Sequence, residues 1–323
     1  MGNVDSAKWK LALTGTPVEN HLGELWSVFR AVAPGVFGGW DQFRKRFAGP
    51  IERDQDEDRR LALRDRLQPF VLRRTKKEVL KDLPPRTESN LVVELNPDER
   101  DAYNRVRMSA IGELDEIARL GDIQDQRFRM LALLTRLRQL ACSPKLVHAD
   151  WPGRSSKLQH LADTLLELRS EGHRCLVFSQ FVTHLQLIRE MLEEEKISYQ
   201  YLDGSTTPVQ RQQRVDAFQD GMDEVFLISL KAGGTGLNLT AADYVIHMDP
   251  WWNPAVEDQA TDRAHRIGQD RPVMVYRMIS QGTIEEEILK LHDSKRELVA
   301  GVIDGSHAAA KLSPKALMEL IRG

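Results

Sequence analysis

The residues best suited to chemistry lie in one stretch of the chain, residues 225–269. Arg263 and Arg266 are three residues apart near its end, where we expect a helix over residues 254–266. Side chains at that spacing share one helix face, and paired guanidinium groups suit the charge of a phosphoryl group in transfer. A glycine-rich turn, KAGGTG (residues 231–236), follows an apolar strand in the same stretch. Because amides freed by glycine suit phosphate oxygens, the stretch predicts phosphate chemistry.

Each of these features also has a simpler interpretation. The two arginines could pair with neighbouring Glu257, Asp258 and Asp262 on a solvated helix face. Many glycine-rich turns need only a positive φ, and this turn does not fit the Walker A pattern. The aromatic pair in DPWWNP (residues 249–254) is typical of a packing corner.

The order and spelling of the motifs favour the functional interpretation. DRAHRIGQ (residues 262–269), following the glycine-rich turn, resembles the last motif of superfamily-two helicase-like motors in their Swi/Snf variant. Other segments resemble further parts of that family, and the resemblance covers the chain up to about residue 304. The segments similar to the second lobe are LVFSQF (176–181), YLDGST (201–206) and QRQQR (210–214). Upstream, LALTGTP (11–17) resembles motif three, residues 68–79 and 83–86 resemble the linker, and residues 137–144 resemble the helical insertion.

The resemblance implies roles for individual residues. Arg266 would be an arginine finger that reaches ATP bound on the first lobe, with Arg263 as its partner and Gln259 orienting the site. Nucleotide sensing and coupling would fall to Thr14, Gly15, Thr16, Gly236 and Asn238. DNA contacts would come from Ser179, Gln180, Asp203, Gly204, Lys231, Gly233, Gly234, Thr235 and Trp252. No metal ligand is expected here, because ATP and Mg²⁺ would be bound mainly by the first lobe.

One acidic segment imitates the family's magnesium-binding DExx box. The sequence DERD (residues 98–101) has the right letters, but that box must end an apolar strand. Here Asn96 and Pro97 precede it, and Asn96 with Glu99 forms a capping box with proline at the first helical position. We therefore expect a helix to start there.

The periodicity predicts an α/β fold with a parallel sheet covered by helices on both faces, and the resemblance makes it RecA-like. Strands are expected at 174–179, 199–202, 225–230, 243–249 and 273–279, with helices at 157–171, 182–195, 208–220, 254–266 and 283–299. Thr207, Pro208 and Gly221 mark the ends of the third helix. Upstream we expect a short strand within 10–17, a helix ending at Pro34, a connector at 37–58, helices at 61–72, 100–120 and 127–140, and an extended piece at 90–95.

These elements suggest four parts. Residues 1–34 would be the end of a first RecA-like lobe, and 35–150 an all-helical linker and insertion. Residues 151–303 would form the second RecA-like lobe with its closing helix, and 304–323 a short helical tail.

Composition limits the remaining possibilities. The net charge is −3, so DNA contacts must come from local patches. The two cysteines form no CxxC pair, and no secretory signal or apolar run of membrane length occurs. These features favour a cytoplasmic, nucleoid-associated protein with no membrane partner.

The sequence contains neither a Walker A loop nor a strand-borne DExx box. The resemblance implies a DNA-stimulated ATPase that moves on duplex DNA and remodels protein–DNA complexes. Because both motifs belong to the family's first lobe, we expect this chain to be the C-terminal motor lobe and to be inactive by itself. Its partners would be double-stranded DNA, the first lobe of the same protein and DNA-bound proteins. The alternatives are a non-catalytic DNA or protein docking module and a self-contained phosphate-binding α/β enzyme. The second is disfavoured because the histidines show no paired-ligand spacing.

Overall fold

The chain divides into two compact units, each with its own core. The first comprises residues 1–79 and 291–312, and the second residues 80–290 and 313–323. The structure, a computed structural model, describes residues 7, 9–13, 22–54, 56–72, 74, 76–118, 123–232, 236–300 and 321.

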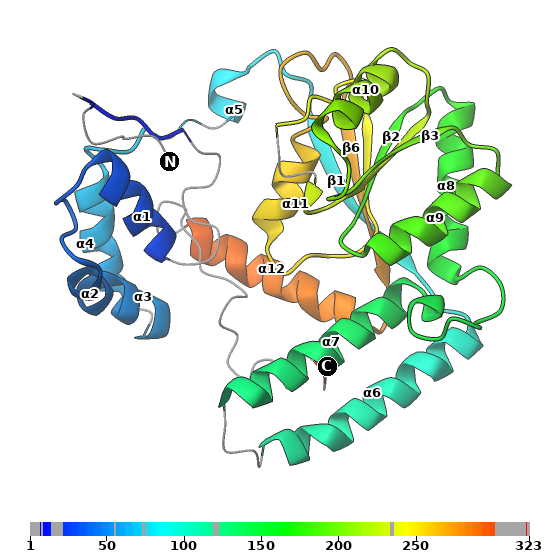
Figure 1. The fold of residues 1–323 in the computed structure, drawn as a ribbon, viewed down its shortest axis with the longest axis horizontal. Helices are drawn as coiled ribbons and strands as arrows, with labels where there is room; N and C mark the ends of the chain where they lie inside the picture. Colours follow the sequence, from blue (N-terminus) through cyan, green and yellow to red (C-terminus); the bar gives the residue numbers. More distant parts are fainter. Residues whose placement is uncertain are drawn as a thin grey trace. The chain divides into compact units, whose positions relative to one another are not determined.

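Six parallel strands from the described residues form the sheet of the second unit (Figure 1). In chain order they are β1 (Arg86–Val93), β2 (Cys175–Ser179), β3 (Tyr199–Leu202), β4 (Val225–Ser229), β5 (Tyr244–His247) and β6 (Val273–Ser280). Their spatial order is β1-β6-β5-β2-β4-β3, and every neighbouring pair runs parallel. The predicted parallel α/β fold is confirmed.

Helices cover both faces of this sheet, which explains the continuous apolar runs of its strands. On β2, Cys175 and Val177 pack in the core that contains α8 (Ser156–Ser170) and α9 (Val182–Glu194). The alternate residues, Leu176 and Phe178, pack in the core that contains α10 (Pro208–Gln219) and α11 (Pro254–Thr261). Successive side chains of a strand point to opposite faces, so a strand covered on both sides must be apolar throughout.

The edge strand β1 differs from the prediction. We expected only an extended piece at 90–95 between helices, whereas residues 86–93 pair with β6 along their whole length. The strand is mostly exposed and its sequence, RTESNLVV, is largely polar. An edge strand with one solvated face contains few apolar residues, so the sequence pattern did not predict the correct bounds of β1.

Capping residues set several helix starts as predicted. The side chain of Thr207 accepts from the amide of Gln210 in a capping box, with Pro208 as the first residue of α10. At the start of α6 (Pro97–Ala118), the amide of Glu99 donates to Asn96 Oδ1 at 3.0 Å, and the amide of Asn96 donates to Glu99 Oε2 at 3.1 Å. The acidic DERD segment is therefore a helix start.

The other predicted helices of the second unit are also present. The helix α7 (Ile123–Cys142) follows α6, with a short 3₁₀ turn, η3 (Pro144–Leu146), behind it. The helix α12 (Ile284–Ala300) follows β6. Of the predicted tail at 304–323, all residues but 321 lie outside the described part of the chain.

The first unit is helical, and part of it was predicted wrongly as a connector. Its core joins α1 (Leu22–Val32), α2 (Trp40–Phe43), a π-helical turn η2 (Arg44–Ala48), α3 (Gly49–Asp54) and α4 (Glu57–Leu67). Aromatic packing explains the helices over 40–54, because Phe37, Phe43 and Phe47 are buried against one another. A short helix, α5 (Lys76–Val79), ends the unit's first segment.

The short strand expected within residues 10–17 is not found in its described part. Residues 10–13 pair with no strand, and Leu11 and Leu13 are 70% and 89% exposed. A lone strand leaves its backbone groups without ladder partners. Thr14, Gly15 and Thr16 lie outside the described residues.

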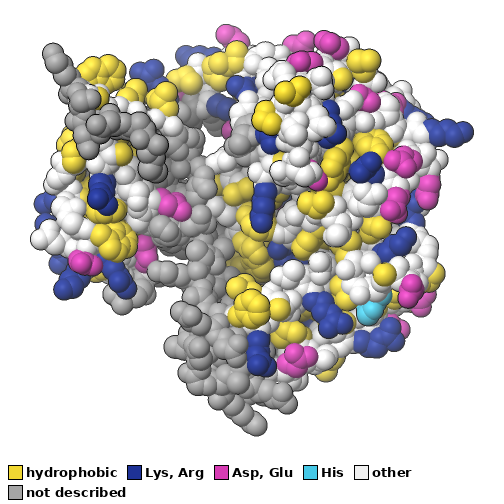
Figure 2. Space-filling view, viewed as in Figure 1, with side chains coloured by type: hydrophobic (Ala, Val, Ile, Leu, Met, Phe, Trp, Pro, Cys, Tyr) yellow, Lys and Arg dark blue, Asp and Glu magenta, His cyan; other side chains and the backbone are white. Residues whose placement is uncertain are grey.

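Among the described helices, none is long and apolar enough to cross a membrane. On the face drawn in Figure 2, basic side chains over the second unit are dispersed among acidic ones. This distribution fits the small net charge of −3.

Candidate nucleotide and DNA site

The carboxyl ends of four strands bring the predicted polar residues to one edge of the sheet. Asp249 follows β5, Gln180 follows β2, Lys231 follows β4 and Asp203 follows β3. Because these strands are parallel neighbours in the order β5-β2-β4-β3, the four residues lie along the same edge. Open α/β sheets bind their ligands at this edge.

Asp249 organises the middle of the edge. Ser179 Oγ donates to Asp249 Oδ1 at 2.5 Å, and the amide of Gln180 lies 3.3 Å from both carboxylate oxygens. Ser179 and Asp249 are only 2% and 3% exposed. Ser179 therefore has an intramolecular partner for its hydroxyl, and its expected contact with DNA stays a prediction. Gln180 is half-buried and remains at the surface of the edge.

Arg138 on α7 completes this centre, and sequence reasoning missed it. Its Nη1 donates to Gln180 Oε1 at 3.0 Å, and its Nη2 donates to the carbonyl oxygen of Pro250 at 2.7 Å. Nη2 also lies 3.9 Å from Asp249 Oδ2, and the guanidinium stacks 4.9 Å from the ring centre of Trp252. This cation–π contact with the buried guanidinium holds the half-buried indole of Trp252 in place.

The sequence did contain a signal for Arg138. It stands at helical spacing with Leu134 and Ala141, both of which are buried. An arginine on the apolar stripe of a helix predicts a buried partner, since burying an unpaired charge is costly.

Burial dominates the electrostatics of this centre. It raises the pKa of Asp249 from 3.8 to about 6, although Arg138 and the hydrogen bond from Ser179 act in the opposite direction. A second buried ion pair lies nearby, with Lys157 Nζ 2.6 Å from Glu285 Oε2 and 3.0 Å from the carbonyl oxygen of Met248. The positive charges of Arg138 and Lys157 therefore balance the negative charges of Asp249 and Glu285.

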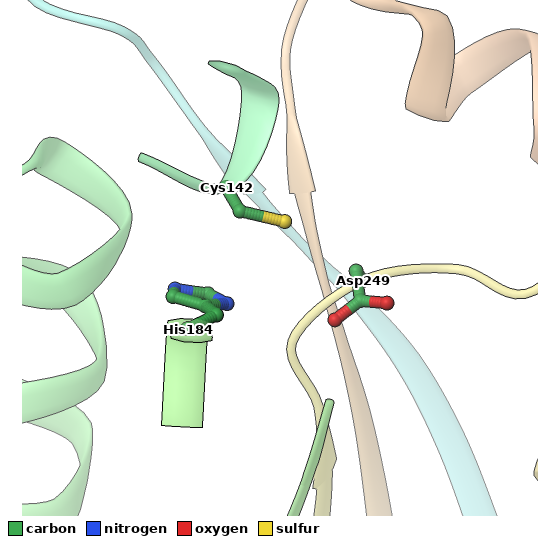
Figure 3. Close-up of side chains that lie close together, drawn as sticks. All are labelled: Cys142, His184 and Asp249. Carbon is green, nitrogen blue, oxygen red and sulfur yellow. The ribbon is translucent and has the colours of Figure 1, made fainter. Parts of the chain in front are cut away.

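Cys142, His184 and Asp249 come together beside these pairs and could be taken for metal ligands (Figure 3). Their ligand atoms lie within 4.8 Å of one another and all three residues are buried. Burial raises the pKa of the Cys142 thiol well above its usual value, and burial together with Lys157 lowers the pKa of His184 to about 3. A divalent cation would add positive charge to a cluster that Lys157 and Arg138 already balance. We interpret the three side chains as part of the interior packing.

The loop after β3 is shaped by Asp203. Its Oδ1 accepts from the amide of Ser205 at 2.9 Å and from the Ser205 hydroxyl at 2.6 Å, and Tyr201 donates to Oδ2 at 2.8 Å. These hydrogen bonds, led by the Ser205 hydroxyl, lower the pKa of Asp203. The carboxylate holds the turn so that Gly204 is exposed.

The glycine-rich turn is only partly described. Lys231, Gly236 and Asn238 are exposed, and Gly236 has a φ of +46°. Gly233, Gly234 and Thr235 lie outside the described residues, so their predicted DNA contacts stay predictions.

Arg263 and Arg266 lie in a loop and not on the predicted helix. The helix α11 ends at Thr261, five residues earlier than expected. Beyond that point the backbone forms tight turns in which an amide bonds to the carbonyl oxygen three residues earlier. The amide of Arg263, for example, donates to Ala260 O at 3.1 Å. The carbonyl groups of the loop that follows have partners outside the helix. The amide of Leu239 donates to Arg263 O at 3.0 Å, and Gln269 Nε2 donates to Ala264 O at 3.2 Å.

The two arginines are half-buried and close enough to affect each other. Burial and the positive charge of Arg266 lower the pKa of Arg263, and its Nε is buried with no hydrogen-bond partner. Arg266 Nη1 donates to the carbonyl oxygen of Leu237 at 2.9 Å. Gln259 lies half-buried on α11, two residues before the helix ends. Two cations, one with an unsatisfied donor, form an arrangement that suits an anion.

Comparison with known proteins assigns the chain. Residues 6–146 match the SNF2-related domain and residues 156–268 match the helicase conserved C-terminal domain. The Sulfolobus solfataricus SWI2/SNF2 ATPase C-terminal domain is 30% identical, with a TM-score of 0.56, and the match covers 68% of this chain and 91% of that chain. This protein belongs to the Swi/Snf family.

Two further Swi/Snf comparisons cover more of the chain. The S. solfataricus SWI2/SNF2 ATPase core in complex with dsDNA is 35% identical with a TM-score of 0.58, over 89% of this chain and 61% of that chain. A Bacillus subtilis protein, named provisionally as an ATP-dependent helicase/translocase, is 40% identical over 96% of this chain. This chain spans 34% of the length of that relative.

Proposed function

We propose that this chain is the C-terminal motor part of a DNA-dependent ATPase that translocates on duplex DNA and remodels protein–DNA complexes. The observation that carries the proposal is the pair Arg263 and Arg266, half-buried in one loop with an unpartnered Nε on Arg263. Family membership and a neighbour whose structure contains dsDNA support it.

In this mechanism Arg266 stabilises the charge that develops on the γ-phosphate, Arg263 is its partner and Gln259 helps to orient the site. Such a finger contributes about 10³–10⁵ in rate. Thr14, Gly15, Thr16, Gly236 and Asn238 sense the nucleotide and couple its hydrolysis to lobe movement.

DNA contacts come from the carboxyl edge of the sheet. Backbone groups at Gly204 and the glycine-rich turn approach the phosphates, while Lys231 adds charge and Trp252 gives an aromatic surface. Asp203 and Ser179 act through their hydrogen bonds, because a carboxylate or a buried hydroxyl is poorly placed to bind a phosphate directly.

ATP and Mg²⁺ are held mainly by the first lobe. The carboxylates of Asp258 and Asp262, which are close to the arginines in the sequence, both pair with Arg86. This chain therefore supplies the arginines and DNA contacts, and it does not hydrolyse ATP by itself.

The experiment is ATP turnover with and without duplex DNA, by this chain alone and by its mixture with a polypeptide carrying the first lobe. We expect DNA-stimulated turnover only in the mixture, and its loss in Arg266→Ala. Arg271→Ala is the matched control, because it removes a positive charge from a side chain that is 60% exposed, five residues away.

Two results would contradict the proposal. Turnover by this chain alone would mean that it contains a complete nucleotide site. Association of the two polypeptides on DNA without turnover would favour the alternative, a non-catalytic DNA or protein docking module.

A further inference from the structure

The loop that carries the two arginines is attached to a distant segment of the chain, residues 84–86. His265 lies between the arginines, and its Nε2 is 2.8 Å from the carbonyl oxygen of Pro84. A carbonyl oxygen can only accept, so Nε2 carries the proton and donates. This hydrogen bond joins residues that are 181 positions apart in the sequence.

Arg86 provides a second attachment on the same side. Its Nη2 donates to Asp258 Oδ1 at 2.6 Å, and its Nη1 lies 3.9 Å from Asp262 Oδ1. Burial lowers the pKa of Arg86, but Asp258 and the neighbouring carboxylates outweigh it, and the pKa is raised. Asp258 lies on α11, and Asp262 is the C-cap residue directly after its last residue, Thr261. The ion pairs therefore fix the end of α11, from which the arginine loop starts.

The opposite side of the loop rests on the segment after the glycine-rich turn. The amide of Leu239 donates to Arg263 O, and Arg266 donates to Leu237 O. Gln269 Nε2 also donates to the carbonyl oxygens of Thr240 and Ala242. The attachments at Pro84 and Arg86 add a second set of contacts, from a segment far away in the sequence.

We propose that residues 84–86 are a positioning element for the arginine loop, with Arg86 and His265 as positioning residues for Arg263 and Arg266. The effect of these residues on catalysis rests on the proposed function of the arginines, but their effect on the position of the loop does not. Displacing a catalytic group by 1 Å costs about 10²-fold in rate. Loss of the Arg86 side chain therefore lowers kcat about 10- to 100-fold and leaves the KM for ATP within about twofold.

The first experiment measures amide hydrogen exchange in the purified chain. The amides of residues 262–266 and 269 are hydrogen-bonded within the loop, so they report its opening. We expect Arg86→Ala to speed their exchange at least tenfold and to leave the amides of α8 unchanged. Unchanged exchange in the loop, or an equal rise in α8, would overturn the proposal, because the second result means global destabilisation.

Arg154→Ala is the matched control for this experiment. Arg154 pairs with Glu194 and Glu195, both at 2.7 Å, and its side chain is 22% exposed, against 17% for Arg86. The Arg154→Ala substitution removes two close ionic contacts from elsewhere in the same unit, and Arg86→Ala removes two close contacts, with Glu88 and Asp258, and a longer one with Asp262. We expect no change in the loop.

The second experiment measures turnover in the two-polypeptide mixture. Arg86→Ala and His265→Ala should lower kcat, and Arg86→Lys and His265→Gln, which keep a donor, should restore most of it. Loss of activity through a raised KM, or wild-type kcat in both alanine variants, would overturn the catalytic part. If the wild-type mixture shows no turnover, the proposed function fails, and the exchange experiment still decides the positioning.

Discussion

The guanidinium of Arg138 donates to the side-chain oxygen of Gln180 at 3.0 Å, across 42 residues of sequence. This bond ties helix α7 to the carboxyl end of β2, where the proposed DNA-contact residues Ser179 and Gln180 lie. The same guanidinium donates to Pro250 O, so one side chain joins α7 to the ends of two neighbouring strands.

Replacing Arg138 should therefore destabilise the second unit strongly. Arg138→Ala leaves the Asp249 carboxylate buried without its cation, and breaking a buried pair in this way costs about 3–5 kcal/mol. Urea unfolding measures the change. Arg154→Ala, which removes a more exposed ion pair, should cost about 1 kcal/mol or less. Equal effects of the two variants would show that the Arg138 network has no special importance.

Asp249 should make stability depend on pH. Its folded pKa of about 6 lies above its ordinary value of 3.8, so the protonated form is favoured by folding. The stability that it contributes is fully present below pH 3.8 and is lost as the pH rises through 6. Relative to Asp249→Asn, the wild type should lose about 1.4 kcal/mol per pH unit within this window. Denaturant unfolding between pH 4 and 7 tests this, and a constant difference between the two proteins would refute it.

His184 should act in the opposite direction. Burial lowers its pKa from 6.5 to about 3, and neither ring nitrogen has a hydrogen-bond partner. Its contribution to stability is present above pH 6.5 and is lost as the pH falls toward 3. His184→Leu should match the wild type within about 1 kcal/mol at pH 7.5 and unfold at a lower pH in an acid titration followed by circular dichroism. An identical acid midpoint would mean that His184 does not titrate on unfolding.

Lys231 should contribute to DNA affinity through charge alone. We expect Lys231→Gln to weaken duplex binding equally for unrelated sequences and to lower the slope of log K against log salt by about 1. Fluorescence anisotropy over a salt series measures both quantities. Lys196→Gln is the control, because Lys196 is exposed and precedes β3, at the opposite edge of the sheet. If both variants reduce the slope equally, the carboxyl edge is not the DNA-binding edge.

The sequence predicted the parts of this molecule that are governed by local signals. Strands β2 and β4 were predicted because every residue in them is apolar or small and buried, and α10 because Thr207 and Pro208 fix its start. The DERD segment was assigned correctly because a capping box is a local pattern.

The parts that were missed depend on distant partners. The helix α11 ends early, and the carbonyl groups of the arginine loop that follows bond to the amide of Leu239 and the side chain of Gln269. Arg138 finds its acceptors on loops that lie 42 and 112 residues away. Helical spacing alone could not predict either result. The motifs pointed to the two arginines in the sequence, but they did not predict that these residues lie in a loop after α11.

The pairing of β1 with β6 has a consequence for how the protein is made. Arg86 pairs with Val273, so the ribosome must add almost 190 further residues before the partner of β1 exists. At about 5–20 residues per second, β1 waits roughly 10–40 s after its own synthesis. During that interval the other strands can already assemble, since β2, β3, β4 and β5 are all made before β6. The nascent sheet would therefore grow from its centre, with the segment that anchors the arginine loop added last.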